Sequence, residues 1–308
     1  KDKGAEPMSD RISPLNESAF AFDCEGSSLI GFLHGGDPSC DVGVLTIVPG
    51  GPQYRTGVGR QLLRLARRLV ADGIHVMRFD HRGLGDSEGE FRGFQYIKDD
   101  IEAAIAEFKR RAPSVKRIIL WGGCDGASAA ILHAHKLPDV VCIVAGNPFV
   151  GSSTSTSKAR QMHYLARIRQ KSFWKKLFKL EYKLSDYASG AIKKVRQRLK
   201  PKKPETAPGS QAQAGARTDF SADLLTGLKM FNGKILFLMG DRFLLSTEFD
   251  RLVSSSPAWR AAYSKPGYQR LDIKGGDQVF STHDAQERMF GLAGKWIRES
   301  YLIEPARA

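Results

Sequence analysis

Short runs of β-branched and other apolar residues alternate with longer stretches of helical periodicity along most of this chain. That alternation is typical of a parallel sheet whose strands are joined by crossover helices. We therefore predict an α/β fold of about eight strands, the first two forming an antiparallel start. The predicted strands span 18–23, 28–34, 42–48, 75–79, 117–121, 140–145, 234–239 and 268–273. The predicted helices span 58–71, 95–111, 127–135, 247–254 and 284–300.

One interval breaks this alternation. The strand ending at Ala145 and the strand starting at Lys234 are separated by 88 residues, far more than an ordinary connection in a compact domain. An inserted subdomain explains the length. The predicted divisions are a flexible leader at 1–10, a core at 11–150 and 230–303, and a basic helical cap at 151–229 with a mobile linker at about 201–217.

The net charge of the chain is concentrated in this predicted cap. The protein has 47 Lys and Arg residues against 33 Asp and Glu, a net charge of +14. Residues 158–203 hold 16 basic and two acidic residues, so the other 262 residues sum to zero. Aromatic side chains interleave with the basic ones, and we expect this segment to attract an anionic membrane surface or an acidic carrier protein, or else to form a solvated face. Nucleic acid is not an expected partner, because no recognition motif accompanies the charge.

The cysteines and the apolar runs limit the class of protein further. No apolar run approaches the ~18 to 20 residues that a transmembrane helix needs. The four cysteines lack the spacing of a zinc site or a disulfide scaffold. We expect a cytoplasmic protein without a metal or another cofactor, with the option of peripheral binding at the inner membrane surface through the basic segment.

The chemistry is expected at residues 121–128, which read WGGCDGAS. A predicted strand runs into Gly-x-Cys-x-Gly and then into a helix, the context of a nucleophile elbow, in which glycines allow a strained turn that exposes the central side chain. Cys124 stands where a Ser is usual. The following helix points its N-terminus at the thiol, so we expect the thiolate to be favoured. A buried Cys in a glycine-rich turn is the alternative.

Two further segments fit the same arrangement. Residues 47–52 end a strand with paired glycines, where an oxyanion loop belongs, and we predict the Gly51 and Asp125 N–H groups as the oxyanion hole. A plain tight turn is the alternative there. Residues 79–87, FDHRGLGDS, resemble the D-x-R-G-x-G-x-S stretch of α/β-hydrolases, so His81 is expected to be scaffold and not a base.

On these segments the chain resembles an α/β-hydrolase over residues 18–300, with a mostly parallel eight-stranded sheet, flanking helices and an inserted helical cap. More narrowly, VPGGPQYR at 48–55, GGCDGAS at 122–128 and GGDQVFS at 275–281 resemble the exosortase A system-associated hydrolase 1 family. That resemblance implies a hydrolase linked to bacterial exopolysaccharide and envelope gene clusters.

A hydrolase triad needs an orienting acid after the nucleophile. Asp241 follows the strand at 234–239 and is the predicted acid, although relatives place the acid about two residues later, at Phe243. Glu248 and Asp250 are alternatives on the next helix, and a surface turn is the alternative reading of Asp241.

The triad also needs a His as general base, and here the sequence departs from the pattern. The GGDQVFS turn carries Gln278 where relatives carry the His. His283, five residues later, is the predicted base, with a solvated residue before a helix as the alternative. His133 and His135 are expected to pack or to face solvent.

These residues predict an acyl hydrolase or acyltransferase that acts on an ester or thioester through Cys124, with an atypical triad. The alternative is a catalytically silenced scaffold that binds a lipid, an envelope polysaccharide intermediate or a partner protein. Gln278 favours the scaffold, whereas retention of the elbow Cys favours the enzyme. Fast esterase activity is not expected, because general-base help contributes ~10²- to 10⁴-fold to such reactions.

Overall fold

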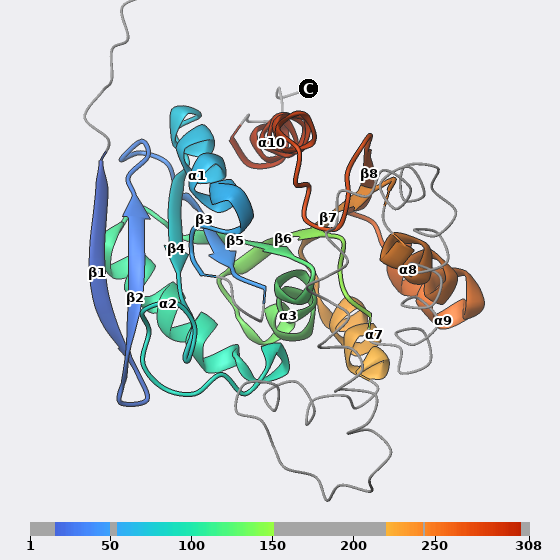
Figure 1. The fold of residues 1–308 in the computed structure, drawn as a ribbon, viewed down its shortest axis with the longest axis horizontal. Coiled ribbons are helices and arrows are strands. Elements are labelled where there is room, and N and C mark those ends of the chain that lie inside the picture. The colour runs from blue at the N-terminus through green and yellow to red at the C-terminus, as the bar shows by residue number, and fades with distance from the viewer. Residues whose placement is uncertain (1–15, 50–53, 151–219, 243, 303–308) are drawn as a thin grey trace, which may run out of the picture. The chain divides into compact units, whose positions relative to one another are not determined.

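The computed structural model describes residues 16–49, 54–150, 220–242 and 244–302, which form an eight-stranded sheet with helices on both faces (Figure 1). The predicted leader, the oxyanion residue Gly51, the basic segment 158–203 and the linker at 201–217 lie outside the described residues. None of the helices in the described ranges is both long and apolar enough to cross a membrane.

The sheet has the strand order β1-β2-β4-β3-β5-β6-β7-β8. β1 pairs with β2 and β2 with β4 in antiparallel register, and all other neighbours are parallel. The strand order therefore runs one way from β3 to β4 and the other way from β5 to β8, so it reverses between β3 and β5. In open α/β sheets, ligands bind at the carboxyl ends of the strands beside such a reversal. The strands are β1 (Glu17–Cys24), β2 (Ser27–His34), β3 (Val42–Ile47), β4 (His75–Phe79), β5 (Arg117–Gly123), β6 (Val140–Gly146), β7 (Lys234–Gly240) and β8 (Tyr268–Ile273).

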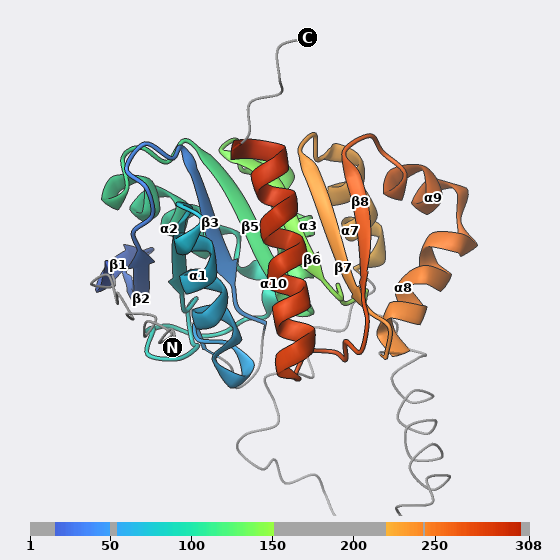
Figure 2. The same cartoon turned by 90° about the horizontal axis from the view of Figure 1, so that it is seen from above.

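Helices cover both faces of this sheet (Figures 1 and 2). α1 and α10 pack on one face, and α2, α3, α7, α8 and α9 contribute to the apolar core on the other. The helices are α1 (Gln61–Ala71), α2 (Lys98–Arg111), α3 (Asp125–His133), α7 (Ser221–Met230), α8 (Leu244–Ser255), α9 (Pro257–Tyr263) and α10 (His283–Ile297). Short 3-10 turns span Val58–Arg60, Phe94–Tyr96 (η2) and Ala134–Lys136 (η3), and a π turn spans Arg298–Leu302.

The central strands and the helices that cover them carry matching apolar patterns. Every residue of β3 and β4 is buried, as expected for strands covered on both faces. α1 buries Leu62, Leu65, Ala66 and Leu69, the three- and four-residue spacing of one helical stripe. Both patterns are local in sequence, which is why the predicted fold class is confirmed by the structure.

The boundary of the predicted cap needs a correction. α7 was not predicted, and the core was expected to resume at residue 230. In the structure Phe220, Leu224 and Leu228 are buried in the core and α7 packs against α3, so the core resumes at Phe220. The four-residue spacing of these apolar side chains is the helical signal that lies at the end of the polar linker.

Candidate active site

Cys124 occupies the tight turn between β5 and α3. Its φ of 49° and ψ of −117° fall in a region that residues with a side chain rarely adopt. The turn is held because the Cys124 N–H donates to the carbonyl of Gly146, at the end of β6, at 2.8 Å. The strained strand-to-helix turn that the motif predicts is therefore present, and it places the sulfur at the carboxyl end of the sheet.

Two glycines make this turn sterically possible. A Cβ added to Gly122 would lie 2.3 Å from the carbonyl carbon of Gly126, and one added to Gly126 would lie 2.6 Å from the carbonyl oxygen of Ile47. A Cβ on Gly123 would meet nothing within 4 Å. The close approach of α3 to the ends of β3 and β5 therefore depends on Gly122 and Gly126, whereas Gly123 is free of this constraint.

Two side chains contact the sulfur. The Nε2 of Gln278 donates to Cys124 Sγ at 3.7 Å, and the thiol donates to Asp125 Oδ1 at 3.6 Å. The structure thus brings together three residues that the sequence singles out. The sulfur has an amide donor on one side and a carboxylate acceptor on the other.

The protonation state of Cys124 differs from the sequence expectation. The pKa of the Cys124 thiol is raised to about 12: burial raises it most, the neighbouring negative charge of Asp125 also raises it, and the Gln278 amide and the main chain of Asp125 lower it. The expected thiolate is therefore not the resting form, because desolvation outweighs the helix N-terminus. Burial also raises the pKa of the Asp125 carboxyl.

The turn that carries Gln278 is held by Asn147, a residue that the sequence analysis missed. Asn147 is buried with a φ of 43°, directly after β6. Its Nδ2 donates to the carbonyls of Asp277 at 3.0 Å and Gln278 at 3.1 Å. Its Oδ1 accepts from the Gly240 N–H at 2.8 Å and from the Ser246 hydroxyl at 3.1 Å. The available sequence signal was an Asn between a strand and Pro148, a position that favours a turn.

The predicted acid and base do not meet the sulfur in this geometry. Asp241 is exposed, and its Oδ1 accepts the N–H of Gly275 at 2.7 Å, which ties the end of β7 to the turn before Gln278. His283 is the exposed first residue of α10, because Thr282 caps that helix by accepting the N–H of Ala285 at 3.3 Å. Gln278, and not His283, therefore faces Cys124.

The two alternative acids lie on α8. Asp250 forms an ion pair with Arg270 of β8, and Glu248 is half-buried. The carboxylate that does contact the sulfur is that of Asp125, within the elbow itself.

The structure describes one of the two predicted oxyanion donors, Asp125. Asp125 is the first residue of α3, where a backbone N–H has no partner within the helix. Gly51 lies outside the described residues. The strand that leads to Gly51 is supported by His81, which is buried, stacks on Phe91 and contacts the carbonyl of Val48 at 3.1 Å. His81 is thus part of the scaffold, as expected.

A small pocket of about 40 Å³ adjoins Cys124 and Gln278, and apolar side chains of Trp121, Leu238 and Phe280 contribute to its wall. One ordered water needs ~10 to 15 Å³ of such space, so a few waters or a small group fit. Across the part of the chain that the structure describes, no cluster of three or more His, Cys, Asp or Glu side chains could hold a metal ion.

Comparison with known proteins supports the assignment of the fold. Residues 57–263 match the family model described as "Serine aminopeptidase, S33", an α/β-hydrolase family. Among characterised proteins, the quorum-quenching protein AidA of Acinetobacter baumannii is 31% identical over 101 residues. That match covers 31% of this chain and 33% of AidA, so it spans about a third of the relative's length.

Similar solved structures cover nearly the whole chain. An esterase of Pyrococcus furiosus superimposes with a TM-score of 0.61 at 17% identity, over 93% of this chain and 92% of its own. The α/β-hydrolase GrgF from Penicillium sp. sh18 gives 0.61 at 18% identity, over 94% and 100%. Est1E from Butyrivibrio proteoclasticus, with bound ferulic acid, gives 0.57 at 16% identity, over 92% and 100%. At these identities the likeness establishes the fold alone.

Proposed function

The chain belongs to the α/β-hydrolase family described as serine aminopeptidase S33, and on that premise we propose that it cleaves or transfers the acyl group of an ester or thioester through Cys124. The observation that carries this proposal is the strained turn at Cys124, between β5 and α3, with the Asp125 N–H beside it. Strained turns of this kind cluster at functional sites, and a strand-to-helix turn exposes its central side chain for nucleophilic attack.

Formation of an acyl-enzyme needs the thiol proton to leave as the sulfur bonds to the carbonyl carbon. The C–O or C–S bond of the substrate then breaks, and the departing alcohol or thiol takes up that proton. The Asp125 carboxylate, 3.6 Å from Sγ, is the acceptor in reach. The Asp125 N–H, with Gly51 as the second predicted donor, would stabilise the oxyanion. Because the pKa of the thiol is about 12, only a small fraction is ionised near neutral pH and attack is expected to be slow.

Removal of the acyl group from Cys124 also limits the rate of turnover. The Gln278 amide can orient a water in the small pocket, but it cannot accept a proton from it. Hydrolysis of the acyl-enzyme then loses the ~10²- to 10⁴-fold that a general base contributes. Transfer of the acyl group to a better nucleophile than water, or slow hydrolysis, is the expected outcome.

The choice of substrates to test draws on the relatives. One structural neighbour is an esterase and another holds ferulic acid, so esters are the first class to test, with thioesters beside them. The narrower resemblance to exosortase A system-associated hydrolases stays a prediction, as does the binding of an anionic membrane surface or an acidic carrier by residues 158–203.

The test is turnover of a panel of p-nitrophenyl esters and acyl thioesters, with mass spectrometry of the intact protein to detect an acyl adduct. We expect slow turnover and an adduct on Cys124, both lost in Cys124→Ala. Cys40→Ala is the matched control, because Cys40 is a half-buried free thiol whose hydrogen bond goes to the carbonyl of Val42. Absence of both turnover and adduct across the panel would leave the silenced scaffold as the better reading.

A further inference from the structure

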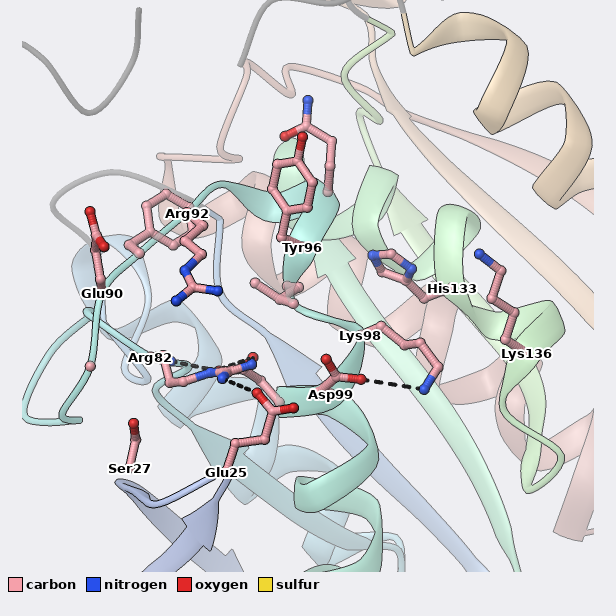
Figure 3. A pocket seen from close by; sticks show the side chains of 15 residues that line it. Glu25, Ser27, Arg82, Glu90, Arg92, Tyr96, Lys98, Asp99, His133 and Lys136 are labelled. Atoms are coloured by element: carbon pink, nitrogen blue, oxygen red, sulfur yellow. Dashed lines mark hydrogen bonds and ion pairs between the residues drawn. The ribbon is translucent and has the colours of Figure 1, made fainter. Parts of the chain in front are cut away.

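A second and larger pocket lies away from Cys124 (Figure 3). It is bounded by the turn between β1 and β2, the loop after β4, η2, the start of α2, and the end of α3 with η3. Its volume of about 630 Å³ falls within the range of small-molecule sites. No residue that lines it also lines the pocket beside Cys124, so the two sites are separate.

Three acidic residues that line this pocket, Glu25, Asp99 and Asp100, form ion pairs with its cations. The Nη2 of Arg82 lies 2.8 Å from Oδ2 of the buried Asp100, and the same guanidinium pairs with Glu25. Lys98 pairs with Asp99 at 3.5 Å, as the dashed lines in Figure 3 mark. The two Arg82 pairs hold the loop after β4 against α2 and the first hairpin.

Two cations at the pocket are left without such a partner. Arg92 and Lys136 are exposed, and neither forms an ion pair with any residue that the structure describes. Figure 3 shows Lys136 beside His133, and it shows Arg92 across the pocket from them, on the loop after β4. The cations at this mouth are thus available to an anionic ligand.

His133 is the buried polar group of the pocket wall. It is 6% exposed, and neither ring nitrogen makes a hydrogen bond of normal geometry within the described ranges. The pKa of His133 is lowered to about 4: burial lowers it most, the main chain of Phe94 raises it, and Lys136, His135 and Lys98 lower it. A neutral imidazole with a free N–H donor, beside the Lys136 ammonium, suits an anionic oxygen, and an unmade buried hydrogen bond is costly.

The far side of the pocket offers different chemistry. Glu90 and Ser27 lie opposite His133 and Lys136 in Figure 3, and both side chains line the pocket. A carboxylate and a hydroxyl accept hydrogen bonds from hydroxyl groups. Tyr96, which also lines the pocket, is 61% exposed and presents an aromatic ring on which the C–H face of a sugar could pack.

We propose that this pocket binds a small anion that also carries hydroxyl groups, the chemistry shared by sugar phosphates and sugar acids. The anionic group lies between Lys136 and His133, and the hydroxyl groups are directed toward Glu90 and Ser27. Because none of these residues belongs to the elbow, binding does not depend on the proposed acyl chemistry.

The test is isothermal titration calorimetry of the full chain with glucose 6-phosphate and glucuronate, and with glucose and inorganic phosphate as the separate halves. At least one of the two sugar anions is expected to bind saturably and more tightly than either half. Lys136→Gln should weaken this binding about tenfold, the size of a lost charge-assisted hydrogen bond. The matched control, Lys116→Gln, removes an exposed charge outside the pocket and should leave binding unchanged.

His133→Leu is the second variant. It removes the unsatisfied ring nitrogens, so the thermal midpoint should be kept while sugar-anion binding falls. Cys124→Ala should bind as the unaltered protein does, which separates failure here from failure of the acyl chemistry. Binding of inorganic phosphate as tight as that of the sugar anions, no binding of either sugar anion, or binding that survives both Lys136→Gln and His133→Leu would overturn the proposal.

Discussion

The side-chain amide of Gln278 lies 3.7 Å from the sulfur of Cys124, although the two residues are 154 positions apart in the chain. An amide therefore contacts the sulfur where the proposed acyl chemistry calls for an imidazole. The amide can donate a hydrogen bond to the sulfur and so stabilise negative charge on it, but it cannot take the proton away.

The first prediction concerns pH. With a pKa of about 12, the thiolate fraction of Cys124 should rise about tenfold for each pH unit between pH 7 and 10. Alkylation of Cys124 by iodoacetamide, followed by peptide mass spectrometry, should show the same slope. A plateau of the rate between pH 6 and 8 would show instead that the thiolate already dominates, as the helix N-terminus alone would suggest.

The second prediction concerns residue 278. It tests the hydrogen bond that Gln278 donates to the sulfur and, separately, the effect of a proton acceptor at the same position. Gln278→Ala removes the hydrogen bond that lowers the pKa of Cys124, so alkylation at pH 8 should become slower. Gln278→His supplies a proton acceptor, and both alkylation and ester turnover should rise, turnover by up to ~10²- to 10⁴-fold, with an inflection between pH 6 and 8.

The control for these variants is Gln269→Ala. Gln269 is exposed on β8, where its Oε1 accepts from Trp296, and its loss should leave the thiol unaffected. If Gln278→His reacts no faster than the unaltered protein, the missing imidazole is not what limits the site.

The third prediction is that Asn147 positions Gln278 and also stabilises the fold. Asn147→Ala removes four hydrogen bonds and places Ala at a φ of 43°, so the free energy of unfolding should fall by ~2 to 4 kcal/mol. Urea denaturation measures the loss. Asn232→Ala, at an exposed Asn, should change it by less than ~0.5 kcal/mol.

A second substitution distinguishes the hydrogen bonds from the backbone strain. Asn147→Gly removes the same bonds but tolerates positive φ, and it should still destabilise the protein and slow alkylation of Cys124. Stability equal to that of the unaltered protein in Asn147→Gly would assign the whole effect to strain.

The fourth prediction compares two neighbouring glycines. Gly126→Ala forces a Cβ to within 2.6 Å of the Ile47 carbonyl oxygen and should lower the free energy of unfolding by more than ~2 kcal/mol or prevent folding. Gly123→Ala meets no atom within 4 Å and should be tolerated to within ~1 kcal/mol. Thermal denaturation of both variants checks this, and equal effects would mean that the backbone moves to accommodate the added methyl group.

Much of the fold was predictable because its signals are local. β4 and β8 have the predicted bounds, and the elbow appears where glycines flank Cys124 after a strand. α7 was missed because its few apolar residues follow a long polar stretch, and the core therefore resumes earlier than predicted. A helix of ten residues stabilised by packing on α3 has only a weak signature of its own.

The sequence by itself determined the sheet, the elbow and the identity of the nucleophile candidate, since periodicity and steric limits act over a few residues. Only the tertiary structure decided that Gln278 rather than His283 faces the sulfur, that Asn147 holds it there, and that the thiol rests neutral. The physical reason is that these properties depend on burial and on contacts between residues 93 to 154 positions apart. Desolvation of Cys124 is set by all the elements around it, and no local pattern records it.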